Sequence, residues 1–207
     1  HMYTHVYQEG IAKKGANNVA SLIMKTLTVI QAVREDEIGG ELNIIFDNCT
    51  GQNKNNTILK FILYLTECDY FKQVNFVFLI VGHTKNTADR LFNALKMKYR
   101  EHNIYTMPHL LKVLDHSEKV TVVPSEEKDF NNWDSFLNLF YQNLVGQVKQ
   151  NHIFCCTRNQ MRQNDQVILN LRKSNLPEHE IVLHMAVKRG FYGRDKCITL
   201  KEAVDNR

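Results

Sequence analysis

Two apolar runs of the sequence each lead into a polar cluster that contains a carboxylate. Residues 43–46 end at Asp47 and a polar loop, and residues 77–81 end at a segment that reaches Asp89. Short apolar runs of this kind are typical of buried strands, and α/β sheets usually place ligands at the carboxyl ends of their strands. The sequence therefore predicts two strand tips of one sheet, each followed by an acid.

Paired carboxylates at neighbouring strand ends suit a hard divalent cation. Mg²⁺ and Mn²⁺ bind oxygen ligands, and they often keep one or two carboxylates together with water and substrate phosphate. Two such ions about 4 Å apart can activate an attacking oxygen and stabilise a leaving one. Asp47 and Asp89 are therefore the candidate catalytic and metal-binding residues, with Mg²⁺ or Mn²⁺ as the expected cofactor.

The same two clusters carry further side chains that suit phosphate or a nucleic-acid backbone. They are amides, basic groups and one histidine, and most precede or follow a candidate acid by a few positions. The candidate nucleic-acid-binding residues are Gln52, Asn53, Lys54, His83, Lys85 and Arg90.

Each candidate acid also has a purely structural interpretation. Asp89 lies three residues after Asn86, so its carboxylate could complete a helix N-cap. Asp47 could form a turn by accepting hydrogen bonds from backbone amides of the loop that follows it. The residue types alone leave both interpretations open.

Strands and helices alternate through the first hundred residues. Residues 4–8, 43–46 and 75–81 are expected strands, and Gly39-Gly40 is an expected break before the second. Apolar residues at helical spacing predict helices from Asn17 or Asn18 to Val33, over 54–68 and over 86–100. This alternation favours an α/β layer structure with some parallel pairing.

The second half of the chain is less regular. A short strand at 104–107, a helix at 108–114 and a strand at 119–123 are followed by a long apolar helix at 129–144. Further strands are expected at 152–156, 166–171 and 181–187, with a terminal helix at 200–205. We expect a core domain over 3–114 and a C-terminal α+β extension over 115–207.

Composition and charge are those of an ordinary globular protein. The 207 residues are 43% hydrophobic and 23% charged, and no apolar run approaches the length of a membrane span. Five cysteines without a spaced framework favour reduced thiols and an intracellular location. From Lys149 onward, eleven Lys and Arg face six Asp and Glu, which suits either a polyanionic partner or a solvated surface.

The two polar clusters resemble a known pattern. Residues 47–55, followed by Gly82-His83-Thr84 and Asp89, are similar to the catalytic core of transposon-derived DDE-type proteins, in a branch with the signature DN-x-x-GQNKN and GHT-x-x-x-x-D. Glu9 and residues 15–21 are similar to another segment of that branch. The resemblance covers roughly residues 4–157.

This resemblance implies an RNase H-like mixed sheet flanked by helices. Residues 4–8 would be the third strand of that sheet, Asp47 the second catalytic acid and Asp89 the third. The first acid belongs on a strand that would precede residue 1. We therefore expect a fold that lacks its first strands, with weak or no activity in this chain by itself.

Two functions follow as expectations. The first is a transposase- or integrase-like enzyme that makes metal-dependent phosphodiester cuts or strand transfers, on DNA rather than RNA, in the nucleus. The alternative is an inactive, domesticated descendant that binds DNA or a protein as a nuclear regulator or effector. An open sheet edge would favour a second copy or another protein as partner, and no membrane contact is expected.

Overall fold

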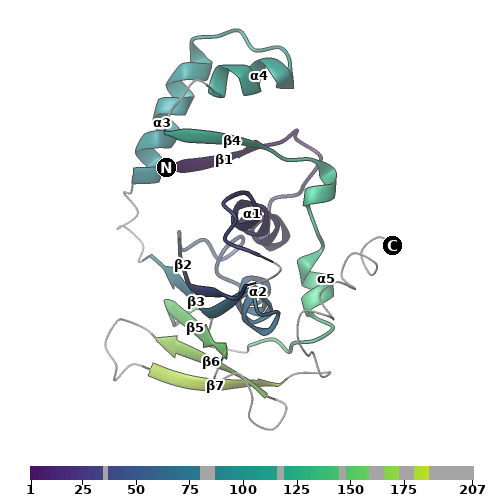
Figure 1. Cartoon of the computed structure of the whole chain (residues 1–207), viewed down its shortest axis with the longest axis vertical. Coiled ribbons are helices and arrows are strands. Elements are labelled where there is room, and N and C mark those ends of the chain that lie inside the picture. The colour runs from purple at the N-terminus through teal and green to yellow at the C-terminus, as the bar shows by residue number, and fades with distance from the viewer. Residues whose placement is uncertain are drawn as a thin grey trace. The chain divides into compact units, whose positions relative to one another are not determined.

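The chain forms two compact units, which are described separately (Figure 1). The first consists of residues 1–13 and 82–130, and the second of residues 14–81 and 131–207. The boundary expected after residue 114 falls inside the first unit. The computed structural model describes residues 1–34, 37–79, 87–115, 119–144 and 148–158, and the backbone of 166–172 and 180–186.

The second unit is built on a five-stranded mixed sheet. Its order is β2 (Gly39–Phe46), β3 (Phe71–Phe78), β5 (Ile153–Thr157), β6 (Gln166–Arg172) and β7 (Glu180–Ala186). β2 and β3 are parallel, while every later pair is antiparallel. The predicted mixed α/β class with helices against a mixed sheet is confirmed, while the RNase H-like arrangement stays a prediction.

Helix α2 (Asn56–Glu67) is the centre of this unit. It joins the parallel strands β2 and β3, and residues 57–67 are buried without exception. The helix packs on β3 and β5 and also contacts α1 (Ala16–Val29) and α5 (Trp133–Leu137). Its sequence is apolar around nearly the whole circumference, which is typical of a helix covered on all sides.

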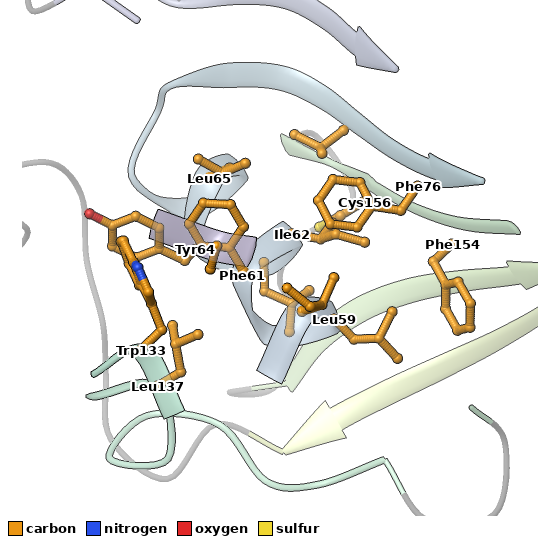
Figure 2. Packing of buried hydrophobic residues seen from close by; sticks show 14 of the residues in the cluster. Leu59, Phe61, Ile62, Tyr64, Leu65, Phe76, Trp133, Leu137, Phe154 and Cys156 are labelled. Atoms are coloured by element: carbon orange, nitrogen blue, oxygen red, sulfur yellow. The ribbon is translucent and has the colours of Figure 1, made fainter. Parts of the chain in front are cut away.

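Aromatic side chains fill the space between α2 and α5 (Figure 2). The Phe61 and Trp133 rings meet edge to face with their centroids 4.9 Å apart, and Tyr64 meets Trp133 at 5.2 Å. The indole N–H of Trp133 donates to the Ser21 hydroxyl of α1 at 3.0 Å. This hydrogen bond satisfies the polar atom of a nearly fully buried ring, as burial requires.

The polar side chains of α2 are partnered by the segment that follows α5. The Lys60 ammonium donates to the side-chain oxygens of Asn138 and Asn143, in the second case at 2.6 Å. The Tyr141 hydroxyl donates to the Glu67 carboxylate. Burial, reinforced by that negative charge, raises the pKa of Tyr141 well above its usual value. Buried charged groups are tolerated only with such partners.

The first unit contains a separate two-stranded parallel sheet. β1 (Met2–Val6) pairs with β4 (Val120–Pro124), and α3 (Thr87–Arg100) and α4 (Met107–Leu114) complete the unit with the 3₁₀ turn η1 (Glu127–Asp129). Leu95, Leu114 and Val120 form its buried cluster. The expectation that residues 4–8 form the third strand of the sheet that leads to Asp47 is therefore wrong, because β1 pairs with β4 in a separate sheet.

Several local predictions also need correction. Helix α1 begins at Ala16, so neither Asn17 nor Asn18 caps it; Asn17 instead accepts a hydrogen bond from the Asp134 N–H at 2.8 Å. The Gly39-Gly40 pair opens strand β2 and does not break the chain. Gly39 packs so closely on Phe71 that a Cβ there would lie 2.7 Å from the ring.

Two further elements differ from those expected from the sequence, because side chains cap helices at these positions. The strand expected at 104–107 is absent, since the Thr106 hydroxyl caps α4 by accepting from the His109 N–H. The long helix expected at 129–144 is reduced to α5, which Asn132 caps through the Ser135 N–H at 3.2 Å. The helix expected at 200–205 lies outside the described residues. Among the described residues, no helix is long and apolar enough to cross a membrane.

The packing of α2 leads to a stability prediction. Phe61→Ala should lower the free energy of unfolding by about 3–5 kcal/mol, because it leaves a cavity beneath Trp133. Urea unfolding followed by Trp133 fluorescence measures this loss. Tyr105→Ala is the matched control, since that ring is 85% exposed and its loss should change stability by no more than about 0.5 kcal/mol. Equal losses for both variants would contradict the packing.

Candidate functional site

Asp47 lies at the carboxyl end of β2, next to the parallel strand β3. Phe46 is in register with Phe78, and the Leu79 N–H donates to the Phe46 carbonyl at 2.9 Å. Phe46 is buried, while Asp47, one position further, is exposed. The prediction that Asp47 follows a strand tip is confirmed, and so is the parallel neighbour strand beside it.

The loop after Asp47 curls around one carbonyl oxygen. The Cys49 carbonyl accepts from the backbone N–H groups of Asn53 at 2.8 Å and Lys54 at 3.0 Å. The Asn48 N–H donates to Oδ1 of Asp47 at 2.7 Å, which is the turn-forming bond of the structural interpretation. The Asp47 carboxylate is thus fixed by its own loop and remains open to solvent.

The asparagines of the loop hold it to the rest of the unit. The Asn53 side-chain amide donates to the Asp47 carbonyl at 3.2 Å, and Oδ1 of Asn55 caps α2 by accepting from the Ile58 N–H at 3.1 Å. Oδ1 of Asn56 accepts from the Leu144 N–H at 2.7 Å. The roles of Asn55 and Asn56 were missed from sequence, although Asn before an apolar helical run is an N-cap signal.

Lys54 is buried, with a relative exposure of 3%. Its ammonium donates to the Lys149 carbonyl at 3.0 Å and lies 5.8 Å from the centre of the Phe78 ring. Burial lowers the pKa of this ammonium from its usual value. Lys54 thus anchors the loop, and its predicted contact with a nucleic-acid backbone would require the bond to Lys149 to open.

A row of polar side chains crosses the sheet face opposite α2. The Asn75 side-chain amide donates to Oε1 of Glu41 at 2.6 Å and to Oδ1 of Asn43 at 2.9 Å. Alternation along β2 places Glu41, Asn43 and Asp47 on this one face, whereas Phe46 faces the core. Ile45 lies on the same face between Asn43 and Asp47 and is 66% exposed, so an apolar side chain separates the Asn75 hydrogen bonds from the strand tip.

The second polar cluster is described only in part. His83 and Lys85 lie outside the described residues. Asp89 lies in the first turn of α3, and both Asp89 and Arg90 are exposed. An acid in the first turn interacts favourably with the helix dipole. The N-cap that Asp89 would complete with Asn86 stays a prediction, because Asn86 lies outside the described residues. Asp89 belongs to the first unit and Asp47 to the second, so their pairing stays a prediction.

The strand tip at Asp47 offers few side chains that could bind a metal ion. Within the described ranges, no three His, Cys, Asp or Glu residues are grouped so that they could hold a metal ion. Asp47 supplies one exposed carboxylate, and Gln52 is exposed in the same loop. Such a set fits a hard cation that keeps most of its waters, as Mg²⁺ does, and does not fit a closed structural metal site.

Three cysteine thiols are free in the described part of the chain, at Cys49, Cys155 and Cys156. Cys156 is buried against α2, and burial raises the pKa of its thiol. Because the reactive species of cysteine is the thiolate, this buried thiol is chemically inert. Cys68 is disulfide-bonded, so the expectation that the cysteines are reduced thiols is wrong for this residue. The intracellular location stays a prediction.

Comparison with known proteins places the chain in a family. The model of the domain of unknown function DUF7869 matches residues 1–175. The chain belongs to this family. The match includes residues of both compact units and both polar clusters. No curated protein and no solved structure matches the chain.

The cap at the start of α2 gives a second stability prediction. Asn55→Ala should lower the free energy of unfolding by about 1 kcal/mol, because the Ile58 N–H loses its acceptor. Asn55→Asp keeps a capping oxygen and should retain most of that stability. Urea unfolding of the unmodified protein and of the two Asn55 variants measures these differences in stability. A loss in the Asp variant as large as that in the Ala variant would show that Asn55 does not act through capping.

Proposed function

We propose that this chain is the catalytic core of a transposase- or integrase-like protein of the DDE type. It cleaves or transfers phosphodiester bonds of DNA with the help of Mg²⁺ or Mn²⁺. Asp47 and Asp89 are the metal ligands in this proposal. The proposal implies a DNA-binding nuclease that derives from a transposable element and acts in the nucleus.

One observation carries the proposal. An exposed carboxylate, Asp47, stands at the carboxyl end of a strand whose parallel neighbour leads along the chain toward α3. α3 begins at Thr87 and exposes a second carboxylate, Asp89, in its first turn. The elements therefore follow the order strand, helix, strand, helix. One acid follows the first strand and another lies in the last helix, as the DDE resemblance implies.

The protein residues and the metal have distinct roles in this proposal. A bound divalent ion would polarise the scissile phosphate and lower the pKa of an attacking water. Asp47 would hold the ion through the oxygen that Asn48 leaves open, while the loop keeps the carboxylate in one orientation. Exposed side chains beside the acids, including Gln52 and Arg90, would contact the phosphate backbone, as would His83 and Lys85.

A second candidate function is supported by the way the loop is built. Asn53, Lys54, Asn55 and Asn56 all bond to groups of the second unit, so the polar loop has a structural role that needs no catalysis. Within the described part of the chain, β2 is also the last strand of its sheet and has one edge open. An inactive module that binds DNA, another protein or a second copy through this edge would use the same features.

Cleavage assays on the natural full-length protein separate the two candidates. With Mg²⁺ or Mn²⁺ and duplex DNA, Asp47→Asn and Asp89→Asn should each reduce cleavage on the order of 100-fold or more, because charge stabilisation at the scissile phosphate is lost. Asp115→Asn, a change at the exposed C-terminal end of α4, is the control and should leave the rate unchanged. An RNA strand of the same sequence tests the preference for DNA.

Two outcomes would redirect the interpretation. Cleavage that survives both substitutions would show that the acids are wrongly assigned. A protein that binds DNA with a steep salt dependence and never cuts it would favour the inactive binding module.

A further inference from the structure

A cavity in the first unit lies between the end of α3 and α4. Its volume is about 410 Å³, within the range of ordinary small-molecule sites. Six residues line it, and four of them carry nitrogen-containing basic side chains. They are Lys98, Glu101, His102, His109, Lys112 and Val113.

Two local structures bring these residues together. Positions 109, 112 and 113 follow the i, i+3, i+4 pattern of one face of α4. Lys98 lies in the last turn of α3, and Glu101 and His102 follow the helix in a turn whose N–H groups donate to the Lys98 and Tyr99 carbonyls, each at 3.3 Å. The cavity is therefore lined by one face of α4 and by the end of α3 with the turn that follows it.

The charge of the cavity favours an anion. Lys98 and Lys112 contribute two positive charges against the single negative charge of Glu101. Nδ1 of His102 lies 2.9 Å from the Lys98 carbonyl, which can only accept, so this nitrogen carries the proton. The backbone N–H of His109 already donates to the Thr106 hydroxyl. The donors offered to a ligand are therefore side chains and not this backbone amide of α4.

Other ligand classes fit the lining less well. Two lysines repel a metal cation, and no metal-binding group of three ligands occurs in the part of the chain that the structure describes. Val113 is the single lining residue with a wholly apolar side chain, although the lysine stems and imidazole rings add carbon surface. An apolar ligand would leave the two ammonium groups without a partner, which a phosphate supplies. A phosphate has several acceptor oxygens and matches the ammonium donors of Lys98 and Lys112.

We propose that the cavity between α3 and α4 binds a phosphate group. The phosphate could belong to a nucleic-acid backbone or to a small phosphorylated molecule, and both present the same oxyanion. Binding here does not depend on cleavage at Asp47. Lys98 lies nine residues after Asp89 on α3, which corresponds to about 14 Å along the helix axis, so the two groups act at separate points.

Binding measurements on the whole chain test the proposal without any metal. Inorganic phosphate, a deoxymononucleotide and a 20-nucleotide duplex are titrated separately, and amide signals of His102 and His109 are followed by NMR. At least one of them should shift these signals. In Lys98→Gln/Lys112→Gln the dissociation constant should rise at least about 10-fold, and for duplex DNA the salt slope should fall by about two.

Matched variants make the result decisive. Lys13→Gln/Lys14→Gln removes the same charge from two exposed lysines outside the cavity and should leave the His102 and His109 shifts intact. Lys98→Arg/Lys112→Arg keeps the charge and should keep binding. Equal effects of the two glutamine variants, or no shift of these signals with any probe, would overturn the proposal. Shifts with all three probes identify a general phosphate site, and shifts with the duplex alone identify a backbone site.

Discussion

The complete burial of α2 is the constraint on which the second unit depends. A helix with no exposed face must find a partner for every polar side chain that it carries, because an unpaired buried polar group is costly. Thr57, Lys60 and Glu67 find theirs in Asp134, Asn138, Asn143 and Tyr141, all from α5 and the residues just after it. Positions 134, 138 and 141 follow the i, i+4, i+7 spacing of one helix face, while position 143 does not. A regular helix through residue 144 would therefore turn Asn143 away from the face that carries the other partners, and Lys60 would lose this acceptor.

The same constraint shapes the candidate site. β2 ends at Phe46 and α2 begins at Asn56, so a short loop must carry the chain from the sheet into a buried helix. The start of such a helix has backbone N–H groups without intrahelical partners, and Asn55 satisfies one of them. Lys54 closes the loop against Lys149, and Asn56 closes it against Leu144. Asp47 is left as the exposed charged group at the strand tip because its neighbours in the loop point to these internal partners.

Local periodicity in the sequence was enough to predict the elements around the site, and long-range pairing was not. The apolar runs before Asp47 and before residue 80 predict β2 and β3, and helical spacing predicts α2 and α3, because each signal lies within a single segment. The partner of β1 is β4, more than a hundred residues away, and no local pattern encodes that choice. The short length of α5 and the roles of Asn55 and Asn56 could likewise not be predicted from local sequence. They depend on which groups α2 buries. The proposed pairing of Asp47 with Asp89 would join residues of two units, so neither unit by itself can test it.

The structural and the catalytic interpretations of the Asp47 loop do not exclude each other. A metal ligand must be held in one orientation before the metal binds, since ordering it afterwards costs conformational entropy. Asp47 is held from two sides, by the Asn48 N–H at Oδ1 and by the Asn53 side chain at its carbonyl. Within the described residues no hydrogen bond reaches Oδ2, and the side chain is open to water. The second bond fixes the backbone behind the carboxylate. The loop thus supplies rigid support that the proposed metal ligand would use, and the same bonds serve a purely structural turn.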